Sequence, residues 1–234
     1  MVVTAGFIVG FDGETRGAAE AMVDCVEATG IPMAMVGLLT ALPNTQLTRR
    51  LAREGRLPEG YAIQRPGDAD QATSGLNFTP SRPAVEILED YASIVRRLYC
   101  PERYFGRVLR LARQLRRQPK QLGSTRGRWT EITALGAVIW RLGFRRGTAL
   151  HFWRTLVGVL VTRPQNFEAA VHLMALLLHF QKHTVFVLDR LARNIARLNA
   201  ESEDRSSDSA VPGVVRTVSG RQASLGPYST GSPG

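Results

Sequence analysis

The sequence predicts an α/β segment, then an all-α region, then a disordered tail. Two apolar runs, at residues 2–11 and 33–42, alternate with helical patterns within residues 1–58, which is typical of strands buried in a parallel sheet. Helical periodicity then dominates residues 81–200. From residue 201 onward Ser, Gly and Pro prevail without any period, so we expect residues 201–234 to be disordered.

The first 58 residues read as a β-α-β-α unit. Asp12 and Gly13 form a turn after the first run, and residues 14–29 follow with helical spacing. Gly30 is suited to cap that helix at its C-terminus. A second helix is expected at residues 45–54, ended by Gly55. This order predicts a parallel sheet, but two parallel strands leave faces and edges open to water, so we expect the remaining strands to lie outside this chain.

A polar segment at residues 59–80 is expected to link this unit to a basic helical domain at residues 81–200. Helical faces recur within residues 85–99, 105–115, 129–144, 149–162 and 167–199. Residues 101–200 carry 18 Lys and Arg against 4 Asp and Glu, whereas residues 1–100 carry 9 against 12. The positive segment favours anionic partners such as lipid headgroups or nucleic acid, and solvated helix faces are an equally good explanation.

The cysteine content and the lengths of the apolar runs indicate the cellular compartment of the protein. Cys25 and Cys100 are the two cysteines, far apart in sequence, which favours a reducing compartment over a disulfide framework. No charged and apolar leader opens the chain, and residues 169–181, the longest helical stretch without Asp, Glu, Lys or Arg, fall short of the roughly 18 residues of a membrane span. We therefore expect a cytoplasmic protein, with peripheral membrane contact as an open alternative.

Three blocks resemble one enzyme family. "GFIVGFDGET" (residues 6–15) is similar to the G-x-I-x-G strand and P-G-E-T turn in the later half of the radical S-adenosylmethionine barrel. "TGIPMAMVGLLTALPNTQL" (29–47) and "SGLNFTPSRPAVEILEDYASIVRRLYCPERYFGRV" (74–108) resemble the cobalamin-binding branch of that superfamily, which includes enzymes that methylate hopanoid lipids. The resemblance is close over residues 1–118 and general in the later helices. It implies that residues 1–58 are the last βα units of a TIM-like barrel.

The resemblance also implies site residues. Gly6 and Gly10 would let the backbone approach S-adenosylmethionine, and Ile8 would lie against its adenine. Glu14 would start the next helix at the ligand-binding end of the strand. The second strand, around residues 35–39, would offer backbone groups to the adenine edge. Asp12 stands where many relatives have proline, and we expect it to cap the following helix.

The family's iron–sulfur cluster needs three cysteines in a C-x-x-x-C-x-x-C motif, which this sequence does not contain. Nor does it contain a candidate cobalamin domain. We therefore expect a C-terminal fragment, inactive alone, whose partner would be the missing N-terminal half if that half is separately encoded. 4Fe-4S and cobalamin would belong to the full-length family, and this chain would keep part of the S-adenosylmethionine pocket.

Two further patterns leave alternatives open. His172, His179 and His183 form a stripe with Glu168, and we interpret it as the wetter side of an apolar helix rather than a metal site. Aromatic residues alternate with arginines near residues 140–154, which suits a membrane interface, core aromatics flanked by charge, or a nucleic-acid footprint. The second hypothesis for the whole chain is a basic helical adaptor for an anionic membrane surface or nucleic acid. The members of this aromatic and arginine group are Trp140, Arg141, Phe144, Arg145, Arg146, Phe152, Trp153 and Arg154.

Overall fold

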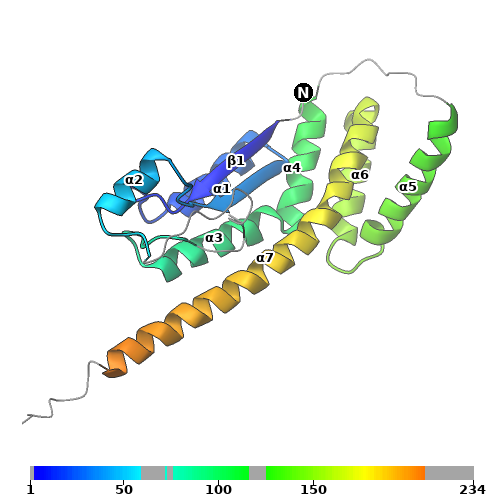
Figure 1. Ribbon diagram of the computed structural model, residues 1–234. Coiled ribbons are helices and arrows are strands. Elements are labelled where there is room, and N and C mark those ends of the chain that lie inside the picture. Colours follow the sequence, from blue (N-terminus) through cyan, green and yellow to red (C-terminus); the bar gives the residue numbers. More distant parts are fainter. Residues whose placement is uncertain (1–2, 59–71, 73–75, 116–124, 209–234) are drawn as a thin grey trace, which may run out of the picture. The chain divides into compact units, whose positions relative to one another are not determined.

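The computed structural model describes residues 3–58, 72, 76–115 and 125–208. They form a mostly helical protein with one small parallel sheet (Figure 1). Residues 1–199 make up one compact unit, and residues 200–234 a second, whose described part, 200–208, is helical. The elements in chain order are β1 (Thr4–Val9), α1 (Ala18–Thr29), β2 (Met33–Leu38), α2 (Gln46–Arg53), α3 (Ala84–Leu98), α4 (Pro101–Gln114), α5 (Thr125–Gly143), α6 (Ala149–Thr162), η1 (Pro164–Asn166) and α7 (Phe167–Asp208).

The sheet consists of β1 and β2, paired in parallel from Thr4 opposite Met33 to Val9 opposite Leu38. The parallel pairing predicted from the β-α-β order is confirmed. Both strands are shorter than predicted: β1 ends where Gly10 adopts a φ of 108°, which interrupts extended backbone. The described residues contain these two strands and no others, so the barrel itself stays a proposal.

Local sequence features account for the two short helices next to the sheet. Gly30 caps α1 in the left-handed conformation, and its N–H bonds the carbonyl of Val26, as predicted. The Oγ1 of Thr45 accepts the N–H of Thr48 at the start of α2. Helix α1 begins at Ala18, four residues later than the pattern from residue 14 predicted, and Gly17 precedes it without a side-chain cap.

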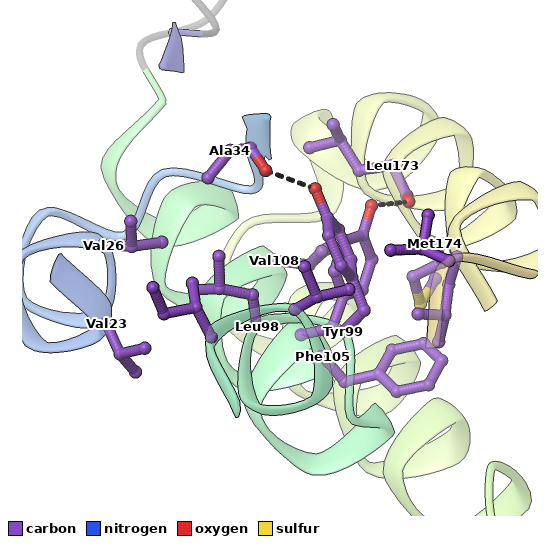
Figure 2. Close-up of a cluster of buried hydrophobic side chains, with 14 of the residues drawn as sticks. Val23, Val26, Ala34, Leu98, Tyr99, Phe105, Val108, Leu173 and Met174 are labelled. Carbon is purple, nitrogen blue, oxygen red and sulfur yellow. Dashed lines mark hydrogen bonds between the residues drawn. The ribbon is translucent and has the colours of Figure 1, made fainter. Parts of the chain in front are cut away.

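One hydrophobic core joins the sheet to the helices (Figure 2). Helices α1 and α3 pack against each other, α3 also packs against β2, and α4 packs against α6. The core draws residues from both sides of segment 59–80, and the predicted domain boundaries stay a prediction. Its members include Val9, Val23, Val26, Leu38, Leu98, Phe105, Val108, Phe152, Met174 and Leu177.

Helix α7 extends further than predicted. It continues to Asp208, so the expected disordered tail is wrong for residues 201–208, and residues 209–234 lie outside the described part. Within Pro164–Asp204 the helix is long and apolar enough to cross a membrane, judged by length and composition alone. The same properties occur in core helices of soluble proteins, and α7 buries Leu173, Met174 and Leu177 in the core.

Candidate functional site

The two faces of the sheet differ sharply in exposure. Val9, Ala34 and Leu38 point into the core, where α1 and α3 cover them. Side chains alternate along a strand, so Ile8 and Met35 point to the opposite face. Ile8 is 43% exposed and Met35 is 70% exposed. This outer face of the sheet is therefore an apolar surface without a covering layer among the described residues.

The two edges of the sheet also differ, and the hydrogen bonding shows which groups lie on each edge. The N–H of Leu39 donates to the carbonyl of Val9, at 2.8 Å, so odd-numbered residues of both strands direct their backbone groups toward each other. The even-numbered residues consequently direct theirs outward. For β1 these are Thr4, Gly6 and Ile8, and for β2 they are Ala34, Val36 and Leu38.

The chain's own side chains satisfy the outward carbonyls of β2. The Tyr99 hydroxyl donates to the carbonyl of Ala34, at 2.5 Å (Figure 2), and the Tyr91 hydroxyl donates to that of Val36, at 3.1 Å. Thr40 Oγ1 donates to the carbonyl of Leu38, at 3.3 Å. Burial raises the pKa of Tyr99, so its hydroxyl keeps the proton that it donates. These three carbonyls are therefore not free to accept hydrogen bonds from another strand.

The outer edge of β1 is different. Among the described residues β1 pairs with β2 alone, and the outward groups of Thr4, Gly6 and Ile8 meet no strand. Gly6 is also open above its backbone: a Cβ built there meets no atom within 4 Å. Thus Gly6 and Ile8, two of the predicted site residues, lie on the open edge of the sheet and on its uncovered face.

The other two predicted residues close the C-terminal end of β1. The N–H of Gly10 donates to Glu14 Oε2, at 2.9 Å, so the carboxylate takes the place of a neighbouring strand at this point. A Cβ built on Gly10 would lie 3.2 Å from the Leu76 side chain. Gly10 is thus required by its backbone conformation and by packing, and any contact with a ligand stays a prediction.

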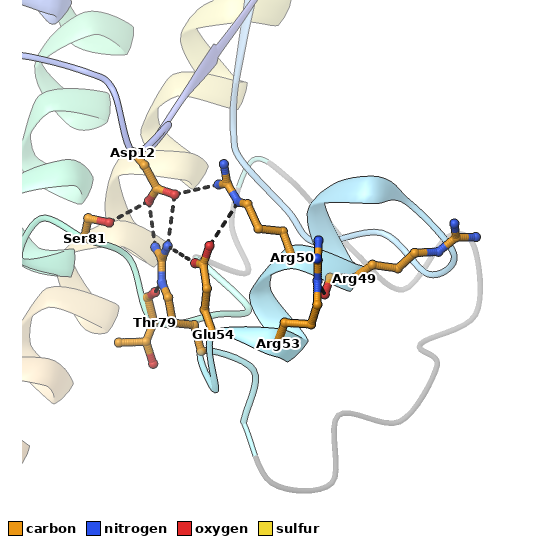
Figure 3. Close-up of polar contacts among 8 residues, drawn as sticks. Asp12, Arg49, Arg50, Arg53, Glu54, Thr79 and Ser81 are labelled. Carbon is orange, nitrogen blue, oxygen red and sulfur yellow. Dashed lines mark hydrogen bonds and ion pairs between the residues drawn. The ribbon is translucent and has the colours of Figure 1, made fainter.

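Asp12 does not cap α1, so that prediction is wrong. Its carboxylate accepts hydrogen bonds from Arg56 and Arg50, each as close as 2.6 Å, and from Ser81 Oγ, at 2.8 Å (Figure 3). The bonds from Arg56 hold the pKa of Asp12 far below its usual value, against an opposing effect of burial. This cluster ties the turn after β1 to the end of α2 and to the segment before α3.

A cavity of about 750 Å³ lies between the sheet, α3 and α7. Its lining includes Gly6, Ile8 and Met35 of the sheet, both edge tyrosines, and His179 and His183 of α7. The two imidazole rings stack in parallel with centroids 6.4 Å apart. Its volume is in the range of small-molecule sites, and the sheet side offers an apolar surface with outward backbone groups beside it.

The cysteines and histidines do not form a metal centre in the described part of the chain. Cys25 is exposed on α1, and Cys100 precedes the first residue of α4. No group of three or more His, Cys, Asp or Glu side chains able to hold a metal occurs among the described residues. An iron–sulfur cluster bound by three thiolates does not fit a sequence with two cysteines.

Comparison with known proteins assigns the helical part of the chain to a family. Residues 45–193 match the model of a domain of unknown function, DUF4070. The chain belongs to the DUF4070 family. The matched range of this DUF4070 protein runs from the cap of α2 into α7, so it includes Arg56, both edge tyrosines and the two histidines of the cavity.

Two curated relatives extend the similarity. A Synechocystis sp. protein named as an uncharacterized methyltransferase is 33% identical over 208 residues, which is 88% of this DUF4070 chain and 38% of the relative. The hopanoid C-2 methylase of Rhodopseudomonas palustris is 29% identical over 157 residues, which is 65% of this chain and 28% of the enzyme. The chain therefore spans well under half the length of either relative. No solved structure matches it.

Sequence reasoning missed the polar contacts that shape this DUF4070 site. Tyr99 lies in the helical pattern predicted at residues 85–99, and its hydroxyl bond to a strand 65 residues earlier has no local signature. Arg56 likewise reaches Asp12 across 44 residues.

Proposed function

We propose that this chain is the C-terminal part of a cobalamin-type radical S-adenosylmethionine methylase that acts on a lipid of the hopanoid class. In this proposal β1 and β2 are the last two strands of the enzyme's barrel, and the helical region follows them. The two named relatives, a methyltransferase and a hopanoid methylase, support the reaction class.

The single observation that carries the proposal is that side chains occupy the outward carbonyls of β2, whereas no strand meets the outward groups of β1 among the described residues. Tyr91 and Tyr99 occupy the carbonyls on the outer edge of β2, as expected for the last strand of an open barrel. The edge of β1 keeps its outward groups at Gly6 and Ile8, where a preceding strand would pair. An uncovered parallel pair is costly in water, so a neighbouring strand supplied by another segment accounts for this asymmetry.

In the assembled enzyme Gly6, Ile8 and the backbone of β1 would form one wall of the S-adenosylmethionine pocket. Ile8 and Met35 offer a flat apolar surface suited to a purine ring, and Gly6 leaves room for close approach. Glu14 would keep the end of β1 in place through its bond to Gly10. When bound, S-adenosylmethionine supplies the methyl group and the radical precursor.

In this proposal other parts of the enzyme hold the iron–sulfur cluster, because two cysteines do not provide the three thiolates, and cobalamin is assigned to those parts as well. The proposal therefore assigns binding and positioning to this chain and assigns the redox step elsewhere. We expect no methylation by the chain alone.

The test is to combine the chain with the part of the Synechocystis relative that the match does not cover. The two pieces should copurify, and the amides of Gly6 and Ile8 should exchange with deuterium more slowly in the complex than in the chain alone. Equilibrium dialysis should show S-adenosylmethionine binding by the complex only. Copurification without slower exchange at Gly6 and Ile8 would contradict the proposed strand pairing.

Gly6→Ala sharpens this test. The variant should melt like the original chain, because its Cβ meets nothing, yet bind S-adenosylmethionine about tenfold or more weakly in the complex, because the methyl group fills space needed for close approach. Gly106→Ala is the matched control, since that glycine is equally uncrowded and lies on the exposed side of α4. Equal affinity in the two variants would remove Gly6 from the pocket.

A further inference from the structure

Helix α6 is apolar on both sides, but the described residues cover only one of them. Phe152, Leu156 and Val159 are buried in the core against α4 and α5. The outer face of α6, defined by Leu150, Trp153, Val157, Leu160 and Val161, points away from that core, and all five side chains are exposed. A helix that is apolar all round is normally enclosed on all sides, so the outer face of α6 is expected to have a partner.

The exposure is large at both ends of this face. Leu150 is 76% exposed and Val161 is 78% exposed, three turns apart on the same side of the helix. Between them lies a shallow groove of about 710 Å³, bounded by Leu109 and Arg113 of α4. Trp153 sits at its side, with its indole N–H donated to the carbonyl of Gly143, at 3.0 Å. The indole nitrogen is therefore satisfied, and the ring faces outward as an apolar surface.

The charges around this face have one sign. Arg113 and Arg154 line the groove, and neither forms an ion pair among the described residues. From residue 132 to residue 167 the chain contains five arginines and no Asp or Glu. An apolar centre with an unpaired cationic border is the pattern of a surface that lies on anionic lipid, where apolar side chains enter the acyl region and guanidinium groups meet phosphates.

We propose that the outer face of α6 docks onto the surface of an anionic membrane. Nucleic acid is a poorer occupant, because four of the five side chains are aliphatic and offer no ring on which bases stack. A second copy of the chain is also poorer, because a two-fold contact would bring the same arginines together without any carboxylate between them. This inference stands apart from the proposed function, since it concerns adsorption of the chain and needs no cofactor or activity.

The experiment is cosedimentation of the full chain with phosphatidylcholine vesicles, with and without phosphatidylglycerol. The chain should bind the vesicles that contain phosphatidylglycerol, and binding should weaken as salt is raised. Leu150→Glu and Val161→Glu should each reduce binding by more than about tenfold, because each removes a side chain that enters the apolar layer. Arg113→Gln and Arg154→Gln should each reduce it about fivefold.

Matched variants make the result specific. Val185→Glu, at a similarly exposed position on α7, and Arg49→Gln, on α2, should retain the original binding. Far-ultraviolet melts verify that the Glu variants remain folded, as expected for exposed positions. Absence of vesicle binding, equal loss in Val185→Glu, or a dimer in gel filtration that Val161→Glu converts to a monomer would each overturn the proposal.

Discussion

Asp12 connects three segments through one carboxylate. It receives hydrogen bonds from Arg56, Arg50 and Ser81, and Arg56 also donates to the carbonyl of Thr79 (Figure 3). Both Asp12 and Arg56 are largely shielded from solvent, so this network is stronger than an exposed ion pair. It holds the turn that follows Gly6 and Ile8 in a fixed position.

Asp12→Asn should lower the free energy of unfolding at neutral pH by about 2 kcal/mol, because the arginines lose their charged acceptor. The folded-state pKa of Asp12 lies below its usual 3.8, so its stabilisation is complete above that value and is lost as the pH falls below it. The free energy of unfolding, measured with urea between pH 7 and pH 2, should therefore fall less at low pH in Asp12→Asn than in the original chain. An equal fall in both proteins would show that Asp12 does not contribute this pH-dependent stability.

Gly10 allows a backbone conformation that other residues rarely adopt. Gly10→Ala should destabilise the chain by about 1–3 kcal/mol, because alanine is strained at a φ of 108° and its Cβ would press on Leu76. Gly6→Ala provides the comparison, since no such cost arises there. Chemical denaturation of the two variants measures the difference, and equal stability would contradict it.

Arg107 is the most buried charge among the described residues, with none of its surface exposed. It donates to Glu27 Oε1, at 2.5 Å, and to the carbonyl of Leu98, and it lies over the Tyr104 ring. Arg107→Met should lower the free energy of unfolding by about 3 kcal/mol, because the partly buried Glu27 carboxylate and the buried Leu98 carbonyl lose their donor. Denaturant unfolding checks this value. A loss no larger than that of Glu27→Gln, which keeps an acceptor for Arg107, would show that the buried charge contributes little.

At the scale of elements, the outer edge of β2 shows how a helix can satisfy a strand. Tyr91 and Tyr99 lie two helical turns apart along the same side of α3 and its end, so their hydroxyls reach alternate residues of the strand. The helix thus supplies side-chain donors where a neighbouring strand would supply backbone donors. Two carbonyls of this edge of β2 are thereby occupied.

Tyr99→Phe should destabilise the protein by about 1–2 kcal/mol, because the buried carbonyl of Ala34 loses its donor. Hydrogen exchange in β2 should accelerate at the same time. Tyr104→Phe is the matched control: it removes a hydroxyl bond of 2.6 Å to the carbonyl of Leu173, between helices, and should leave β2 exchange unchanged. Equal exchange in β2 for the two variants would show that Tyr99 does not hold this edge.

At the scale of the whole molecule, the core stabilises the chain, whereas the open face of the sheet lowers its stability in isolation. The core joins β1, β2 and helices α1, α3, α4, α6 and α7, so these helices and one face of the sheet share a single core. The outer face of the sheet exposes Ile8 and Met35, and no strand in the described part of the chain pairs with the outer edge of β1. Such an edge favours association with other chains and lowers stability in isolation.

Met35→Lys should reduce self-association of the chain at unchanged fold, with the free energy of unfolding altered by no more than about 0.5 kcal/mol, because this side chain is mostly solvated. Light scattering and denaturant unfolding measure the two effects. If the proposed barrel is right, the same variant should fail to assemble with the uncovered part of the Synechocystis relative. Assembly as efficient as that of the original chain would place this face outside the interface.

Several features of this protein follow from its sequence alone. The order of elements, the parallel strand pair, the Gly30 cap and the bounds of α6 were predictable because periodicity and capping act within a few residues. The start of α1 was predicted too early, because Glu14 bonds the N–H of Gly10 and Asp12 bonds Arg56 instead of the helix.

Only the tertiary structure decided which edge of the sheet is closed and which apolar face remains bare. Tyr99 meets Ala34 from 65 residues away, and nothing near either residue in sequence specifies that bond. The apolar pattern of α6 is equally strong on its buried and exposed sides, so periodicity does not tell which side the core covers. Local chemistry selects the elements, whereas long-range packing determines which of their surfaces are left for a ligand, a strand or a membrane.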